Sequence, residues 1–223
     1  MLPLSYKCLF IMLVLMPAYA VAENGSPARI KYSECAAYKI ASYAFDYRKR
    51  QGHDKWLAND IWNAHINPAL HAMHTRTGTG VGGSVSTNLD YALKRIPNDP
   101  RSLKAIIDYS FIIKSRPLHR PLIRSPECYL QQAIRFASDD PTPRFLYGFY
   151  LFKKGHYEDA VAWYKKGLSI DPDSSEGHYN LGLILLKLKR YREAQHHASM
   201  AYKKHFPLPW LRDKLSMLGY PID

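Results

Sequence analysis

The feature that most constrains this chain is a repeat of 34 residues in its C-terminal part. Moving the sequence along itself by this period superposes three pairs of residues: Gly148 and Gly182, Tyr157 and Tyr191, and Ala160 and Ala194. A fixed period of this length is typical of solenoids, in which each helical hairpin buries its apolar face against the next hairpin. The repeat therefore predicts an all-α fold built from stacked hairpins.

Residues at fixed places in the repeat have physical roles in such a hairpin. Gly148 and Ala160 are small enough to let the two helices of one hairpin approach closely, and tyrosines fill the space around them. Pro172 should end the second helix, because proline lacks the N–H that would continue the hydrogen-bond ladder. Small and helix-breaking residues thus predict where the helices touch and where they stop.

These motifs resemble the tetratricopeptide repeat (TPR). The segments that carry the resemblance are Leu146-Tyr-Gly-Phe-Tyr150, Gly155-His-Tyr-Glu-Asp-Ala160, His178-Tyr-Asn-Leu-Gly182 and Tyr191-Arg-Glu-Ala194. The resemblance implies a TPR-type helical-hairpin solenoid with a first TPR at 141–174, a second at 175–207, a C-terminal capping helix within 208–223 and degenerate TPR-like helices at 88–140. It also implies a protein that binds other proteins or peptides.

A second resemblance covers most of the chain. The segments that carry it include Phe45-Asp-Tyr-Arg48, Leu89-Asp-Tyr91, Pro97-Asn-Asp-Pro-Arg-Ser-Leu103 and Phe206-Pro-Leu-Pro-Trp-Leu-Arg-Asp-Lys-Leu215. Together these segments are similar to a group of exported bacterial TPR proteins. This resemblance implies a fold and a place in the bacterial cell envelope, and it implies no biochemical activity.

The first 22 residues have the pattern of an export signal. Lys7 supplies a positive charge, an apolar run follows, Pro17 breaks the run, and Ala20 and Ala22 offer small-residue cleavage sites. The alternative is a transmembrane anchor, but the apolar run is about half of the ~20 residues needed to cross a bilayer. We therefore expect residues 1–22 to be removed and the mature chain to be periplasmic or secreted, with no transmembrane segment.

Export changes how the cysteines are interpreted. Removal of the signal takes Cys8 away and leaves Cys35 and Cys128, an even pair in an oxidising compartment. We predict a disulfide between them, and loop-entropy models give so long a loop about 4–5 kcal/mol of stabilisation. Two buried free thiols are the alternative. Neither cysteine lies in a Cys-x-x-Cys motif, so a thiol enzyme is not expected.

The part of the chain before the repeats also has mainly helical patterns. We expect helices at residues 32–50, 60–73, 88–95, 102–114 and 127–138. Pro68 should bend or break the second of these, and Ser102 should be the N-cap of the fourth. The Gly/Ser/Thr-rich stretch at 75–87 is expected to be a flexible loop. It separates an N-terminal helical segment at 23–74 from the degenerate TPR-like helices.

The chain is basic, with 31 Lys and Arg against 19 Asp and Glu and a formal charge of +12. Nucleic acid often binds such a charge, but it is not expected as a partner of an exported protein. An anionic envelope polymer, from the cell wall or lipopolysaccharide, is an alternative partner, and a solvated basic face is the plainer interpretation. The cations of a polymer footprint would be Lys153, Lys154, Lys165, Lys166, Lys187, Lys189, Arg190, Lys203 and Lys204.

The resemblance to TPR proteins also implies which side chains face the concave groove of the repeats. The partner-binding residues expected there are Phe145, Phe149, Phe152, Lys153, Tyr179, Leu183 and Lys187. Some TPR proteins hold a peptide carboxylate in this groove with Lys, Arg and Asn; here Phe145, Phe149 and Leu183 replace those groups, so no carboxylate clamp is expected. An apolar groove rimmed by lysines suits an amphipathic helix or an extended apolar peptide. The alternative is that the protein's own segment 32–47 fills the groove.

Motifs for catalysis or ligand binding are weak in this sequence. Gly78-x-Gly80-x-x-Gly83 matches the letters of a dinucleotide fingerprint, but no βαβ unit surrounds it. His65, His71 and His74 lie close in sequence, but a structural zinc site usually takes four ligands. No Gly-x-Ser-x-Gly elbow or His-Glu-x-x-His helix occurs. We expect no enzyme, no cofactor and no metal site, and an enzyme that uses the three histidines is the weakest alternative.

Overall fold

The structure is a computed structural model that describes residues 35, 40–49, 51–80 and 83–222. Its regular structure is helical apart from two strands of two residues each in the described part of the chain. The prediction of an all-α fold is confirmed. The chain divides after Leu146 into two compact units, which we call the N-terminal unit and the repeat unit. The export signal expected at 1–22 lies outside the described residues.

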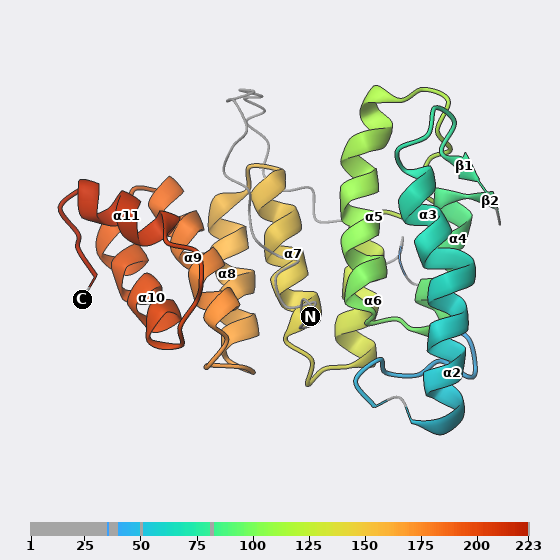
Figure 1. The fold of residues 1–223 in the computed structure, drawn as a ribbon, viewed down its shortest axis with the longest axis horizontal. Helices are drawn as coiled ribbons and strands as arrows, with labels where there is room; N and C mark the ends of the chain where they lie inside the picture. The colour runs from blue at the N-terminus through green and yellow to red at the C-terminus, as the bar shows by residue number, and fades with distance from the viewer. Residues whose placement is uncertain (1–34, 36–39, 50, 81–82, 223) are drawn as a thin grey trace. The chain divides into compact units, whose positions relative to one another are not determined.

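The N-terminal unit contains a helix that changes its hydrogen-bond pattern just before a proline (Figure 1). α2 (Gly52–Ile61) continues as a π-helical turn (Trp62–Ile66) and then as α3 (Asn67–Ala72). The N–H of Asn67 donates to the carbonyl of Trp62, which is the longer bond of a π turn. Pro68 follows this turn. The disturbance that the sequence predicted at Pro68 thus takes the form of a π turn, and the helix continues beyond it.

The Gly-rich stretch forms a small hairpin and the start of a helix. β1 (Thr79–Gly80) pairs antiparallel with β2 (Gly83–Ser84), and α4 (Val85–Arg95) begins directly after β2. The side chain of Ser84 accepts a hydrogen bond from the first turn of α4 and so caps it. The loop predicted at 75–87 is therefore wrong at its last three residues, because this cap starts the helix earlier than the run of apolar residues indicates.

The next helix, α5 (Pro100–Ile112), has a different N-cap from the one predicted. Asp99 is the N-cap, and its carboxylate accepts hydrogen bonds from both the backbone N–H and the hydroxyl of Ser102. Pro100 lies in the first turn, where a missing N–H costs nothing. α5 ends in a 3-10 turn (Ile113–Ser115), and α6 (Pro126–Phe136) follows after a loop.

Residues 40–49, which we call the strap, contradict the helix that the sequence predicted at 32–50. They form turns and irregular backbone. The N–H groups of Ala41 and Phe45 donate to carbonyls in the last turn of α4. Phe45 and Tyr47 pack against the buried cluster formed by α2, the π turn and α4. Phe45 and Tyr47 are therefore partly buried by tertiary contacts of an irregular strap and not by one face of a helix.

A disulfide joins Cys35 to Cys128 in α6, as the sequence predicted. Both cysteines are buried, and the bond spans a sequence separation of 93. It therefore ties the region just before the strap to the middle of the chain, within the N-terminal unit.

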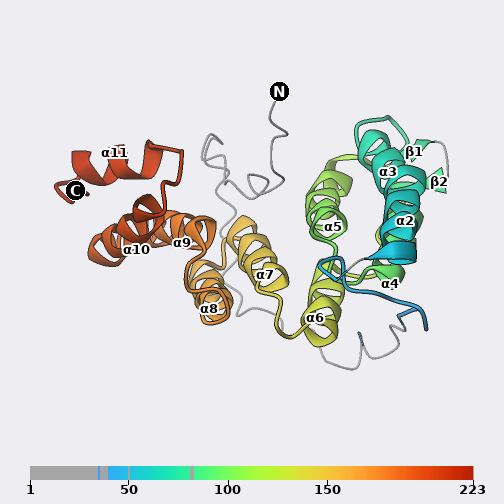
Figure 2. The same cartoon turned by 60° about the horizontal axis from the view of Figure 1, so that its bottom comes forward.

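The repeat unit consists of the hairpins that the period of 34 predicted (Figure 1). The helices are α7 (Thr142–Lys153), α8 (Tyr157–Leu168), α9 (Ser175–Lys187), α10 (Tyr191–Lys203) and the closing helix α11 (Trp210–Met217). The first residues of α7 belong to the N-terminal unit. α9 packs on both α8 and α10, and Figure 2 shows α11 beside α9 and α10. The capping helix expected within 208–223 is thus present.

Two glycines allow the helices of the repeat unit to approach closely. A Cβ on Gly148 would lie 2.5 Å from Cδ2 of Tyr164 in α8, and a Cβ on Gly182 would lie 2.7 Å from Cδ2 of Leu211 in α11. Carbon atoms do not approach so closely without strain, so a larger residue would push the helices apart. The role predicted for Gly148 is confirmed.

Candidate functional site

Three of the residues expected in the groove are buried in the structure. Phe149, Tyr179 and Leu183 expose 7%, 2% and 4% of their surfaces. Tyr179 stacks on Phe206 with ring centroids 4.3 Å apart. Burial and the nearby Tyr202 raise the pKa of Tyr179 to about 12. These side chains pack within the folded chain, so their first contribution is to its stability.

The other members of the predicted set are more accessible. Lys153 and Lys187 are exposed, and Phe152 is half-buried against the ring of Tyr157, with centroids 5.5 Å apart. Phe145, also half-buried, belongs to the N-terminal unit. The binding of a partner by these residues stays a prediction. The surface available to a partner consists of lysines and partly covered apolar groups rather than an open apolar stripe.

Segment 32–47, which was the predicted occupant of the groove, is described from residue 40 onward. Phe45 and Tyr47 pack in the N-terminal unit, and the hydroxyl of Tyr47 lies 3.4 Å from that of Thr142. The part before residue 40 lies outside the described residues except for Cys35. The hypothesis that this segment fills the groove therefore stays a prediction.

The turns between the two helices of each hairpin have the same backbone design. After α7, the N–H of His156 donates to the carbonyl of Leu151, at 3.0 Å, and Gly155 has a φ of 84°. After α9, the N–H of Arg190 donates to the carbonyl of Leu185, at 2.9 Å, and Lys189 has a φ of 60°. This left-handed helix ending usually takes glycine. The second turn therefore carries a lysine where the first carries glycine.

Arg190 joins these two turns. Its Nη1 donates to Oε2 of Glu158 at 2.8 Å, and its Nε and Nη2 donate to the two carboxylate oxygens of Glu193 at 2.6 and 2.7 Å. The hydrogen bonds from Arg190 lower the pKa of Glu193. Glu158 begins α8 and Arg190 precedes α10, so the contact places the α7–α8 turn beside the α9–α10 turn.

We call Lys153, Lys154, Lys187 and Lys189 the turn-edge lysines. All four are exposed. Among the described residues, no ion pair involves Lys187 or Lys189, whereas Lys204, at the opposite end of α10, pairs with Asp173 at 2.9 Å. In the part of the chain that the structure describes, Lys187 and Lys189 are therefore exposed cations without an ion-pair partner.

Two histidines of the second hairpin face each other across α9 and α10. Nε2 of His178 lies 3.0 Å from the carbonyl oxygen of Pro172, so this nitrogen carries a proton and donates. Nδ1 of His178 then accepts a hydrogen bond from Nδ1–H of His197, 2.9 Å away. Burial, together with the nearby His178, His196 and Lys165, lowers the pKa of His197 to about 4. The contact therefore favours an uncharged His197.

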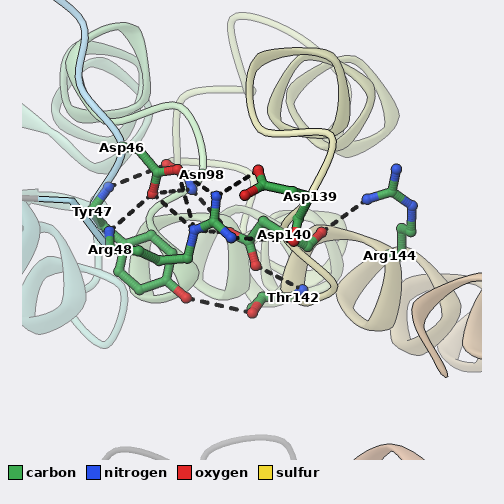
Figure 3. A network of polar contacts seen from close by, with 8 residues as sticks. All are labelled: Asp46, Tyr47, Arg48, Asn98, Asp139, Asp140, Thr142 and Arg144. Carbon is green, nitrogen blue, oxygen red and sulfur yellow. Dashed lines mark hydrogen bonds and ion pairs between the residues drawn. The ribbon is translucent and has the colours of Figure 1, made fainter. Parts of the chain in front are cut away.

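A polar network holds the strap in the N-terminal unit (Figure 3). Arg48 donates to Asp46 at 2.6 Å and to Asp139 at 2.8 Å, and it lies 3.8 Å from Asp140. The side-chain amide of Asn98 donates to Asp46 at 2.8 Å and to Asp140 at 2.9 Å. Sequence reasoning assigned no site role to Asp46, Arg48 or Asn98. Their only signal was that the motifs at 45–48 and 97–103 both carried the second resemblance.

The surroundings shift the pKa values of Asp46 and Asp140 in opposite directions. Burial raises the pKa of Asp140, against hydrogen bonds from Thr142 and Asn98. Burial also opposes ionisation of Asp46, but the hydrogen bonds from Arg48 and Asn98 outweigh it and lower the pKa of that carboxyl. Asp140 also accepts from the backbone N–H of Thr142 at 3.0 Å, so both of its oxygens are satisfied. We call this network the clamp, because it holds the strap in the N-terminal unit and so has a structural role.

The remaining motifs have structural surroundings. Gly78, with a φ of 65°, packs against the ring of His119, and the paired strands β1 and β2 precede α4. The His65 ring shares a 2.9 Å hydrogen bond with the side chain of Asn88 and stacks on Tyr91.

The described residues include no group of three or more His, Cys, Asp or Glu side chains that could hold a metal ion. None of the described helices is long and apolar enough to cross a membrane.

Comparison with known proteins agrees with this geometry. Residues 148–189 match the family model of the TPR repeat. The matched segment runs from Gly148 in α7 to Lys189 in the turn after α9, so it covers part of α7 and all of α8 and α9 and ends before α10. No curated protein matches the chain. Residues 148–189 are therefore a TPR-type repeat, and repeats of this kind usually bind other proteins.

Proposed function

We propose that this chain is an exported protein-interaction module of the bacterial cell envelope, which binds a protein or peptide partner through its repeat unit and catalyses no reaction. The observation that carries the proposal is that the TPR match includes Gly148 and Gly182, which lie one repeat apart and each allow a close contact between helices. Helical repeats of this kind present extended surfaces to a partner.

The disulfide supports the assignment to an oxidising compartment. Cys35 and Cys128 are paired and buried, and structural disulfides are rare in reducing compartments. The apolar pattern of residues 1–22 supports export by the same route that the sequence predicted. Fractionation of cells that produce the tagged chain tests this part of the proposal: recovery of the full-length, uncleaved chain from the cytoplasm would contradict it.

Site-specific photocrosslinking in living cells tests the interaction. A photoreactive amino acid at position 152 or 187 lies on the accessible part of the repeat unit, and position 203, exposed at the far end of α10, is the control. We expect one defined protein adduct from the first two positions and none from the control. Adducts that do not depend on position, or no adduct at all, would contradict a protein-binding role for this surface.

A further inference from the structure

We infer that two copies of this chain associate through the outer face of α11, in an antiparallel arrangement about a two-fold axis. This association goes beyond the proposed function, because it does not depend on which partner the repeats bind. It follows from the exposed side chains of α11, from their order along the helix and from the charges at the centre of that order.

One face of α11 attaches the helix to the repeat unit. Leu211 and Leu215 are fully buried, and α11 contacts both α9 and α10 (Figure 2). Leu211 lies so close to Gly182 that a Cβ on this glycine would come within 2.7 Å of Cδ2 of the leucine. The two leucines thus hold α11 in place from one side, and the residues on its other side are left to solvent.

The solvent side of α11 carries a stripe of exposed residues, which we call the outer stripe. Its members are Trp210, Asp213, Lys214 and Met217, whose spacing of i, i+3, i+4 and i+7 places them on one side of the helix. Trp210 exposes 41% of its surface and Met217 exposes 80%. Single exposed apolar residues are common, but large ones that share a stripe provide a surface for association.

The order of residues along the outer stripe is self-complementary. It runs apolar, acidic, basic, apolar. A two-fold axis between residues 213 and 214 therefore places Trp210 against Met217 of the second copy, and Asp213 against Lys214 of the second copy. Each contact occurs twice, because in a two-fold interface the same patch of both copies is used. Methionine sulfur makes favourable contacts with aromatic rings, so both ends of the stripe gain from the pairing.

The charges at the centre of the outer stripe favour a second copy as the occupant. Asp213 lies 3.7 Å from the adjacent Arg212, and both side chains are about half exposed. Within the described part of the chain, Lys214 takes part in no ion pair. A second copy brings an opposite charge to each of Asp213 and Lys214, so the middle of the interface is neutral. Such charge complementarity fixes the register of the two helices.

The charge of the whole chain and the length of α11 limit the strength of the contact. The formal charge of +12 makes copies repel one another, but salt at about 0.15 M screens charges that are more than ~8 Å apart. α11 has only 8 residues, which puts this interface at the small end of specific interfaces. We therefore expect a weak dimer, with a dissociation constant of about 10–100 µM.

Sedimentation equilibrium of the purified chain, at about 5–500 µM protein and about 0.15 M salt, tests the inference. The charge variants are Asp213→Lys and Lys214→Asp, which place like charges across the two-fold axis. The control is Lys55→Asp, the same substitution at an exposed lysine of α2. We expect each charge variant to weaken self-association by about ten-fold or more, and the control to change it less than about two-fold.

Mixing the two charge variants separates a lost contact from a damaged fold. Each variant brings the charges that the other needs, so the mixture should form heterodimers within about three-fold of the affinity of the unmodified chain. An unmodified chain that stays monomeric at the highest concentration would overturn the inference and leave the outer stripe to a different partner. Dimers that the charge variants do not weaken, or a mixture that stays monomeric, would also overturn it, because the contact would then lie elsewhere or have another register.

Discussion

Acidification should destabilise the repeat unit through the pair of histidines between α9 and α10. Only one hydrogen can lie between the two Nδ1 atoms of His178 and His197, which are 2.9 Å apart. The pKa of His197 is lowered to about 4 in the folded chain, from an ordinary value of 6.5. The unfolded chain therefore binds the proton more tightly, and stability is lost as the pH falls.

The magnitude follows from the two pKa values. One pKa unit corresponds to about 1.4 kcal/mol, so the upper bound on this histidine's contribution to the unfolding free energy is about 3.5 kcal/mol, and solvent screening of the partly buried ring reduces it. The contribution is complete above pH 6.5 and disappears between that pH and about 4. The titratable groups around the ring are His178, His196, Lys165 and Glu193; the first three lower the pKa of His197 and Glu193 raises it.

Urea unfolding, followed by tryptophan fluorescence at a series of pH values, measures this effect. His197→Asn keeps an N–H donor near His178 but does not titrate, so its unfolding free energy should fall less between pH 6.5 and 4 than that of the unmodified chain. His196→Asn, which alters the exposed neighbour, is the control and should keep the original pH dependence. Identical pH profiles for His197→Asn and the unmodified chain would refute the reasoning.

Other substitutions test the packing, the disulfide and the clamp, each by urea unfolding. Gly148→Ala should lower the unfolding free energy by about 1–3 kcal/mol, because its methyl group would collide with Tyr164; no loss would mean that the helices can separate freely. Cys128→Ser should cost about 2–5 kcal/mol, and reduction of the unmodified chain should reproduce this loss. Arg48→Met should cost about 2 kcal/mol, between the values of exposed and buried ion pairs, since it leaves the buried Asp140 without its cation; an unchanged urea midpoint would show that the clamp is dispensable.

The repeat unit could be predicted from the sequence because the residues that end its helices and allow close packing lie next to the features they determine. Glycine ends α7, proline and aspartate separate α8 from α9, and small residues recur where helices touch. These signals act within a few residues of the place they specify. The period then fixed the number and order of the hairpins without any long-range information.

The strap could not be predicted in this way because distant residues decide its conformation. Asp46 and Arg48 have partners at Asn98 and Asp139, about 50 and 90 residues away. Within the local window, the alternation of apolar and polar residues around Phe45 satisfies a helical pattern equally well. The contacts with α4 and the α6–α7 turn outweigh that local preference. The N-cap of α5 is Asp99 and not the predicted Ser102 for a local reason. Asp99 precedes Pro100, and both residues suit the start of a helix better than Ser102 does.

The candidate surface was only partly predictable. Repeat position identifies the face of a helix on which a residue lies, and so it found Lys153 and Lys187 correctly as exposed cations. It does not report whether neighbouring side chains cover that face, and this is why the burial of Phe149 and Leu183 was missed. The left-handed turn at Lys189 was missed as well, because the corresponding residue of the first repeat is glycine and gives no hint of a charge.

The long disulfide also has a consequence for biogenesis. A chain that emerges N-terminus first presents Cys35 well before Cys128, which lies 93 residues later. At about 5–20 residues per second, the first thiol waits roughly 5–20 s for its partner. The sequence has three cysteines, and one of them lies in the predicted signal. If the predicted signal is removed, Cys35 and Cys128 are the cysteines of the given sequence that remain, and a wrong pairing of either one then needs a cysteine outside this sequence. Correct oxidation of this protein then depends on keeping nascent copies apart, and hardly at all on an isomerase that reshuffles bonds within one chain.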